Sequence, residues 1–490
     1  MESTILAQQN EKHVRKNEFV LYLMAVFFYT TMTGMVASYK NAYLVNVLVL
    51  EKETISLYNG ILSISGFVIS FFVTMYIDGH KPSKKGKFRP LGIFIALPMA
   101  VATVLTFVAP TGLPTTVLFI YIVAIGIMYA ISTSFGDVFN KIALVMTPNK
   151  RERDQVISFR SIASAVGNSA PLVVVLVIGL ILDAYIKKTD SGINKEQVEY
   201  IIGAAICAVV GAITMLIGMR AVRERVVYAD KRQNPLLGFI DILSNKWTWV
   251  ILISDFLKNF RQIANYMGVF LAAALLGGSD KFLFFGLPTG IGTAVGMLII
   301  NALLKKFNSK QLYIASGIYS ICANVLAFAV GYAYFKSESS VLQIIFIAAL
   351  FLIGLQFGAS NLLPSMFQAD VLEDIELKTG KRLDASLPFV LGIGTTISGT
   401  IASVLSPLIL LGEDSIIKYM QPVEGVYPEQ STYTKIAMLF FYTIFHGLMM
   451  LLAGLPFFFY KLTGKTMEDV HEQVLKQREA MKKAQEKQDS

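Results

Sequence analysis

The sequence predicts an all-α membrane protein with twelve transmembrane helices. Of its 490 residues 54% are hydrophobic and 16% are charged, a composition that water-soluble domains do not have. Apolar runs of about 20 residues recur between Phe19 and Leu462, and each is long enough to cross a hydrocarbon core of roughly 30 Å. Backbone hydrogen bonding in lipid requires these runs to be helical.

Turn and charge signals separate the expected spans. These are residues 19–46, 56–77, 91–109, 115–146, 157–185, 199–219, 247–276, 281–304, 311–334, 341–368, 385–411 and 433–462. The first apolar run is longer than the core of a cleavable signal peptide, and it follows a polar tail. We therefore expect the first span to stay in the membrane.

Positive charge is distributed unevenly among the loops. If both termini are cytoplasmic, most of the 43 Lys and Arg lie on the cytoplasmic side, which is the orientation that such an asymmetry predicts. The net charge of +9 is then explained without a nucleic-acid partner. Cys207 and Cys322 lie in apolar runs and indicate packing rather than a disulfide or a metal site. We expect a monomer that spans the lipid bilayer of the cell (plasma) membrane many times.

The longest polar connection inside the chain follows the sixth span. It divides the sequence into a cytoplasmic N-terminal tail (1–18), a six-helix bundle (19–219), a cytoplasmic central loop (220–246), a second six-helix bundle (247–462) and a cytoplasmic C-terminal tail (463–490). The charged loops of the two halves also correspond in position. Parallel six-helix halves around a central cavity describe the major facilitator fold.

Three charged loops carry a family signature. "ADVLEDIELKTGKR" (369–382) resembles the segment ADVVDYGEWKTGKR of the glycoside–pentoside–hexuronide cation symporters, the melibiose-permease-like branch of the major facilitator proteins. "DGHKPSKKGKFRP" (78–90) and "NKRERDQVISFR" (149–160) resemble that family's loops after spans 2 and 4. The resemblance implies a transporter of glycosides, sugars or glucuronide-like solutes that works by alternating access.

The charges in these loops predict a cytoplasmic gate. Acidic and basic side chains from the two bundles can pair when the inner side closes, and partly exposed pairs of this kind contribute on the order of 0–1 kcal/mol each, so the closure can open again. The candidate residues are Asp78, Arg89, Arg153, Asp370, Glu373, Asp374, Lys378 and Arg382. Solvated loops with helix-capping charges are the alternative interpretation.

The membrane-embedded residues depart from the family pattern. Melibiose-permease-like members have acidic residues in spans 1 and 2 and a lysine in span 11, and this sequence has none of them at membrane depth. The two tryptophans, Trp247 and Trp249, lie where interfacial residues are expected rather than at a sugar site. Sodium coupling therefore cannot be carried over from the resemblance.

Span 4 holds the candidate for ion coupling. Asp137 and Lys141 are four residues apart and share a helical face, and Asp137 lies where the resemblance places an Asp or Asn near the cation and sugar sites. A lone titratable carboxylate favours coupling to H+ over coupling to Na+. A static ion pair is the alternative, and no other cofactor is expected.

Span 7 holds the candidates for substrate binding or gating. Its polar residues Asp255, Lys258, Asn259, Arg261 and Gln262 are expected to be functional, because an ionisable group costs at least about 2.5–3.5 kcal/mol at the centre of a membrane helix. Asp255 and Lys258 can pair at i, i+3, which leaves Arg261 to bind another acid or a substrate. A polar clamp between the bundles is the alternative.

Spans 5, 10, 11 and 12 add further candidates. By resemblance, Arg160 contacts sugar hydroxyls or closes the inner side of the cavity, although an arginine that snorkels to the interface fits as well. Gln356 and Asn361 in span 10 and Thr396 in span 11 offer donors and acceptors, and such groups also hold helices together. His446 is expected to be a packing residue.

Together these patterns predict a secondary transporter of a small organic solute that is coupled to protons. The sequence has no H-E-x-x-H and no nucleophile–base arrangement, so we do not expect an enzyme. An uncoupled or export-type transporter of a more apolar or aromatic solute is the alternative, because the cavity walls are expected to be aromatic and weakly charged. A sensor that binds its ligand without translocation is a further alternative.

Overall fold

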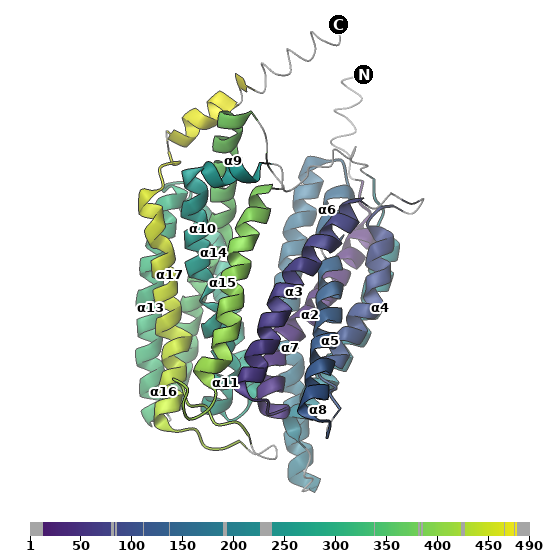
Figure 1. The fold of residues 1–490 in the computed structure, drawn as a ribbon, viewed down its shortest axis with the longest axis vertical. Helices are drawn as coiled ribbons and strands as arrows, with labels where there is room; N and C mark the ends of the chain where they lie inside the picture. Colours follow the sequence, from purple (N-terminus) through teal and green to yellow (C-terminus); the bar gives the residue numbers. More distant parts are fainter. Residues whose placement is uncertain are drawn as a thin grey trace. The chain divides into compact units, whose positions relative to one another are not determined.

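The computed structural model describes most of the chain. The described residues are 13–79, 83, 86–110, 112–136, 138–189, 194–225, 238–337, 339–380, 383, 386–422, 427–464, 466–474 and 476–477. Apart from two isolated β-bridges, all regular structure in these ranges is helical, as Figure 1 shows.

The first half of the chain contains the helices of the first six spans. They are α2 (Lys16–Ala42) with its π-helical continuation η1 (Tyr43–Val47), α3 (Lys52–Gly79), α4 (Arg89–Leu105), α5 (Thr115–Phe135), α6 (Val138–Val145), α7 (Lys150–Thr189) and α8 (Lys195–Ala221). Helices α5 and α6 together cover the expected span 115–146, and Asp137 between them lies outside the described residues.

The second half contains the remaining spans. Its helices are α9 (Phe239–Ser244), α10 (Lys246–Asn259), α11 (Gln262–Leu276), η2 (Ser279–Phe282), α12 (Leu283–Leu303), α13 (Ser309–Ser337), α14 (Ser340–Thr379), α15 (Ser386–Leu410), α16 (Thr432–Phe440), η3 (Phe441–Phe445), α17 (His446–Gly454) and η4 (Leu455–Phe459). The last four follow one another as the twelfth span.

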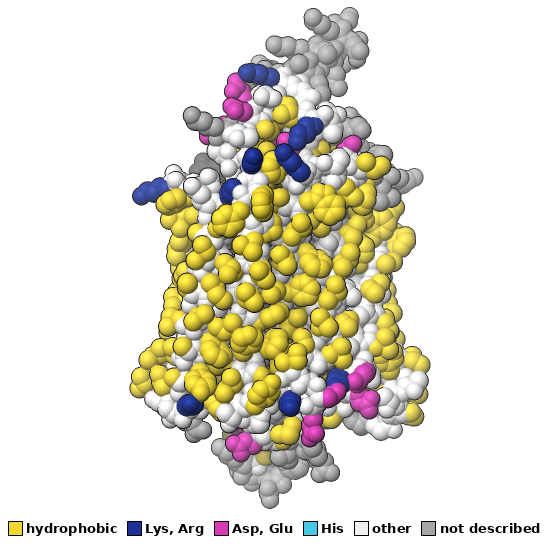
Figure 2. All heavy atoms as spheres, turned by 60° about the vertical axis from the view of Figure 1, so that its left-hand side comes forward, with side chains coloured by type: hydrophobic (Ala, Val, Ile, Leu, Met, Phe, Trp, Pro, Cys, Tyr) yellow, Lys and Arg dark blue, Asp and Glu magenta, His cyan; other side chains and the backbone are white. Residues whose placement is uncertain are grey.

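The surface of these helices suits a bilayer. Within the described residues, ten helical segments are long and apolar enough to cross a membrane, α4 is a shorter apolar helix, and α10 with α11 makes the seventh span. Large apolar side chains such as Phe72, Leu298 and Ile344 are exposed. Figure 2 shows hydrophobic side chains over the middle of one face and charged side chains toward its two ends. The exposed apolar belt is what lipid contact requires.

The charged signature 369–382 is mostly helical, although its charge predicts a loop. Helix α14 continues through this segment to Thr379, because Glu and Lys are good helix formers and Val371 and Ile375 are buried against the second unit's core. Gly380 ends the helix in the left-handed conformation with φ 67°.

The seventh span is also different from the expected continuous helix. It is interrupted at Phe260 and Arg261, where a turn separates α10 from α11. The backbone N–H groups of both residues bond to carbonyls three residues earlier, so the break leaves few polar groups unsatisfied. Irregular backbone at membrane depth is tolerated where it is buried in protein or lines a cavity.

The chain forms two compact units. The first comprises Met1–Lys231, Ala272–Leu283 and Pro407–Gln430, and the second comprises Arg232–Leu271, Phe284–Ser406 and Ser431–Ser490. The first unit thus includes two short segments from the second half of the chain. The domain boundaries expected from the sequence remain predictions.

Candidate functional site

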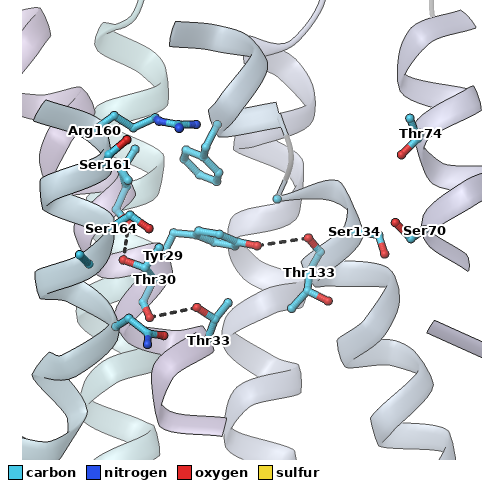
Figure 3. A pocket seen from close by; sticks show the side chains of 15 residues that line it. Tyr29, Thr30, Thr33, Ser70, Thr74, Thr133, Ser134, Arg160, Ser161 and Ser164 are labelled. Carbon is cyan, nitrogen blue, oxygen red and sulfur yellow. Dashed lines mark hydrogen bonds between the residues drawn. The ribbon is translucent and has the colours of Figure 1, made fainter. Parts of the chain in front are cut away.

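A polar pocket of about 700 Å³ lies within the first unit (Figure 3). Helices α2, α3, α5 and α7 provide most of its walls. The lining residues are Val26, Tyr29, Thr30, Thr33, Ser70, Thr74, Thr133, Ser134, Gly136, Phe139, Arg160, Ser161, Ser164, Ala165 and Asn168. Most of them carry a hydroxyl or an amide, and among the described lining residues only Arg160 carries a charge.

Helix α2 places Tyr29 at the pocket. The Tyr29 ring stacks on Phe139 with centroids 4.8 Å apart, and its hydroxyl donates to the Thr133 carbonyl at 3.2 Å (Figure 3). Gly136 has to be a glycine for this arrangement, because a Cβ there would overlap the Tyr29 hydroxyl. The phenol ring is therefore fixed in position as part of the pocket wall.

Helix α7 places the guanidinium and several neutral polar groups on the same pocket. Arg160, Ser164 and Asn168 recur every four residues and follow one face of the helix, and Ser161 lies next to Arg160. Hydroxyls and amides can both donate to and accept from the hydroxyls of a sugar. A guanidinium adds planar, bidentate recognition of an anionic or strongly polar group.

The polar residues of the seventh span lie in the second unit. Lys258 Nζ pairs with Asp255 Oδ1, as the spacing predicts. Asn259 Nδ2 donates to the Thr395 carbonyl at 2.6 Å and to Ser398 Oγ at 3.2 Å, and Gln262 Nε2 donates to Asn259 Oδ1 at 2.7 Å. These side chains connect the break in the seventh span to α15.

Arg261 lies at the break itself. Its guanidinium stands 4.9 Å from the ring centroid of Phe357, which in turn lies 5.0 Å from the His446 ring. Arg261 Nη1 and both polar atoms of the Gln356 side chain are buried without a hydrogen-bond partner among the described residues. Such groups are costly to bury unpaired, which makes this break a polar point inside the second unit.

The structure thus brings the predicted site residues together in two groups. Arg160 belongs to the pocket of the first unit, and the span 7 residues belong with Gln356 to the second. Lys141 is half-buried on α6, Asn361 is exposed on α14, and Thr396 is half-buried on α15. The roles proposed for them from the sequence remain predictions.

Most of the first unit's pocket is not among the residues predicted from the sequence. Tyr29, Thr30 and Thr33 on α2 and the α7 residues after Arg160 are additions from the structure. Their spacing along one face of each helix was the available signal. It is weak, because the same pattern holds helices together in many membrane proteins.

The candidate gate residues make local contacts inside each unit. Arg89 Nε donates to the Met219 carbonyl at 3.0 Å, Glu373 pairs with His471 at 2.9 Å, and Lys378 pairs with Asp374 at 2.5 Å. Asp370 is half-buried on α14 and Arg153 is half-buried on α7. Arg382 and the side chain of Asp78 lie outside the described residues. The gate between the bundles remains a prediction.

Glu152 fastens the N-terminal segment to the first unit. Its carboxylate accepts the backbone N–H of His13 at 3.1 Å and of Val14 at 3.0 Å, and the Thr147 hydroxyl at 2.5 Å. Burial by itself raises the pKa of Glu152, but these donors, Thr147 first, together hold its pKa below the ordinary value. The anchor is therefore a charged carboxylate at neutral pH.

This anchor is expected to depend on pH. Because the folded pKa is depressed, the stability that Glu152 contributes is present above its unfolded pKa of about 4.3 and is lost as the pH falls through the folded pKa. Amide hydrogen exchange, corrected for the intrinsic effect of pH, should show His13 and Val14 protected at neutral pH and exposed in acid. In Glu152→Gln the protection should already be reduced at neutral pH. Equal protection in both proteins at every pH would contradict this anchor.

The sequence of residues 21–464 matches the family described as MFS/sugar transport protein. An uncharacterized symporter of Bacillus subtilis (strain 168) is 24% identical over 399 residues, which are 79% of this chain and 80% of that protein. In Escherichia coli (strain K12), a protein with the provisional name sulfoquinovose importer is 24% identical, and the alignment covers 72% of this chain and 73% of that protein. Another, provisionally named a glycoside/cation symporter, is 24% identical and covers 82% of each chain.

Solved transporters share the fold. The xylose transporter XylE from E. coli in an inward open conformation superimposes with a TM-score of 0.60 at 12% identity, over 93% of this chain and 98% of that one. The nucleoside transporter NupG superimposes with a TM-score of 0.58 at 15% identity, over 91% of this chain and 100% of that one. The predicted fold of twelve helices in two six-helix bundles is confirmed.

Proposed function

Because this chain belongs to the MFS/sugar transport protein family, we propose that it carries a sugar or glycoside through the polar pocket of the first unit, with Arg160 binding the most polar or anionic part of the solute. The resemblance to the glycoside–pentoside–hexuronide symporters is confirmed, and the protein is a secondary transporter that spans the membrane many times.

The pocket is the observation that carries the substrate class. Its walls offer neutral hydroxyls and amides over a volume of about 700 Å³, which is within the range of small-molecule sites. A sugar presents hydroxyls on both faces, so a wall of mixed donors and acceptors suits it. Relatives named for sulfoquinovose and for glycosides support the same class, and an anionic sugar would use the guanidinium of Arg160 most fully.

Ligand-induced thermal stabilisation tests the substrate class. Purified protein is heated with sugars, glycosides, glucuronides, sugar sulfonates and apolar aromatic compounds, each with and without Na+ and at two pH values. A substrate raises the unfolding temperature once its concentration exceeds its dissociation constant. Hits among the sugars support the proposal. Hits confined to apolar compounds would overturn it and favour the uncoupled or export-type alternative.

We further propose that transport is coupled to protons through Asp137. The names of the symporter relatives support cation coupling. The choice of H+ rests on the lone carboxylate in span 4, on Lys141 four residues later and on the missing acidic residues of spans 1 and 2. The uneven charge of the loops supports a plasma-membrane protein with both termini cytoplasmic. We also propose that it works as a monomer.

Replacing Asp137 by asparagine is expected to separate binding from coupling. The variant should exchange labelled for unlabelled substrate in proteoliposomes but should not accumulate substrate against its gradient when a pH gradient is imposed. Exchange in the same vesicles is the control for folding and insertion. Full accumulation driven by the pH gradient would exclude this role for Asp137.

A further inference from the structure

A second group of acidic residues lies away from the polar pocket, at the N-terminal end of α8. Glu196 and Glu199 on α8 meet Asp280 of η2. All three are buried, and Glu199 and Asp280 are each 1% exposed. The segment that carries Asp280 comes from the second half of the chain but packs within the first unit. No residue of this cluster lines the polar pocket.

One cation serves several of these carboxylates. Lys195 Nζ lies 2.8 Å from Asp183 Oδ1, 3.3 Å from Glu199 Oε1 and 3.7 Å from Asp280 Oδ2. Its nearest carboxylate, Asp183, is at the more exposed edge of the cluster. Lys281 does not balance the excess charge in the same way, because its Nζ donates to the Leu276 carbonyl at 2.5 Å. Negative charge therefore exceeds positive charge in a buried space.

Glu196 has donors of its own. The Ser279 hydroxyl donates to its carboxylate, and the Tyr200 hydroxyl donates to Glu196 Oε1 at 3.1 Å. Tyr427 and Asn46 also lie within hydrogen-bonding reach of Glu196. Several donors stabilise the charged form of a carboxylate. Glu196 is therefore the carboxylate of this cluster that has several donors of its own, and Glu199 and Asp280 share fewer.

Glu199 and Asp280 converge on one point. A Cβ placed on Gly179 of α7 would lie 2.7 Å from Asp280 Oδ2 and 2.9 Å from Glu199 Oε1. Apart from the shared Lys195, neither oxygen has a hydrogen-bond donor among the described residues. One lysine, which lies nearest to Asp183, does not balance two buried carboxylates held close together, so a proton or a further cation is expected between them.

Tyr39 independently indicates a ligand at this place. Its side chain is 0% exposed, and its hydroxyl has no hydrogen-bond partner among the described residues. The Tyr39 ring lies 5.2 Å from the Tyr200 ring, and its hydroxyl is within electrostatic range of Asp280, Glu199 and Glu196. A buried phenol without a partner beside carboxylates is a polar group directed into a binding site.

We propose that Glu199 and Asp280 together bind one proton and form a proton site separate from Asp137. The charged and titratable groups beside them are Lys195, Glu196 and Tyr200 on α8 and Tyr39 on α2, and Asp183 of α7 shares Lys195 with them. Tyr427 and Tyr419 of the segment 407–430 lie beside Glu196, and Lys281 follows Asp280 on η2. The two acids come from the two halves of the chain. When the proton is lost, the negative charges of Glu199 and Asp280 repel each other, which favours separation of η2 from α8.

Infrared difference spectroscopy between neutral and alkaline pH tests the site on full-length protein in lipid vesicles, without any substrate. Wild type should show the carbonyl band of a buried protonated carboxylic acid at neutral pH. The band should be lost in Glu199→Gln and in Asp280→Asn, because the remaining acid can then ionise beside Lys195. It should persist in Asp183→Asn, which changes the exposed edge, and in Asp137→Asn.

Isotope labelling gives a test in the unmodified protein, so the result does not depend on how the variants fold. If the proton is shared, labelling the carboxyl carbons of aspartate and, separately, of glutamate should each shift part of the band. A band that only one label or only one variant affects would overturn the shared site. The absence of such a band in wild type would also overturn it. If Na+ then stabilises the protein against heat, and Glu199→Gln removes that stabilisation, the site binds a metal cation instead.

Discussion

Replacing Arg160 by alanine is expected to weaken binding of a transported sugar roughly 10- to 100-fold. A hydrogen bond to a charged group contributes about 1.5–3 kcal/mol, and about 1.4 kcal/mol corresponds to a factor of ten in affinity. Arg160 is the one charged side chain among the described residues of the pocket, so no neighbour can replace it. Binding affinity from thermal shifts, and uptake into proteoliposomes, measure the loss.

Arginine and lysine should differ at this position. Arg160→Lys keeps the charge but loses the planar fork of donors, so its affinity should fall between wild type and the alanine variant. The loss should be largest for solutes that carry an anionic group. Arg223→Ala is the matched control, because the Arg223 side chain is exposed and lies outside the pocket. Equal affinities in Arg160→Ala and Arg223→Ala would show that Arg160 only anchors α7 at the membrane surface.

The helical spans could be predicted because a segment that crosses the lipid must be apolar and must satisfy its backbone hydrogen bonds internally. A run of about 20 apolar residues therefore predicts a helix, and the predicted spans and the observed helices correspond in order. The break at Phe260 and Arg261 could not be predicted, because "SDFLKNFRQIANY" has neither glycine nor proline to mark it. Tertiary contacts accompany it, since the side chain of Asn259 bonds to α15.

The site could be predicted only where it is charged. Arg160 and Arg261 were recognisable because ionisable groups are rare in apolar helices. Thr30 and Thr33 were not, because neutral hydroxyls occur throughout membrane helices and satisfy themselves locally, as Thr33 does by donating to the Thr30 carbonyl at 3.0 Å. A pocket is made by several helices, and one sequence does not show which faces meet.

The acidic cluster of α8 illustrates the same limit. Glu196 lies just before the span expected at 199–219. A charged residue at that position usually indicates the solvent-exposed first turn of a helix. Its burial results from contacts with Ser279 and Tyr427, which lie far away in the sequence. Contacts between residues far apart in the sequence therefore decide whether acidic residues at a helix end are buried, and one sequence does not show these contacts.

Replacing Gly296 by alanine is expected to destabilise the second unit by about 1–3 kcal/mol or more. Helices α12 and α14 approach backbone to backbone through two Gly-x-x-x-Gly patterns, Gly292 with Gly296 and Gly354 with Gly358. A Cβ on Gly296 would overlap the Leu355 carbonyl oxygen, which is backbone and cannot rotate away. Overpacking of this size forces a backbone shift. The thermal unfolding midpoint in detergent measures the loss.

Gly392→Ala is the matched control, because a Cβ on Gly392 of α15 would meet nothing within 4 Å. Its stability should remain within about 0.5 kcal/mol of wild type. The α12–α14 crossing also sets the position of Gln356 and Phe357, which lie between Gly354 and Gly358, so Gly296→Ala should disturb the stacking of Arg261 on Phe357 as well. If both alanine variants unfold at the same temperature, the crossing can separate without cost, and it does not hold Phe357 against Arg261.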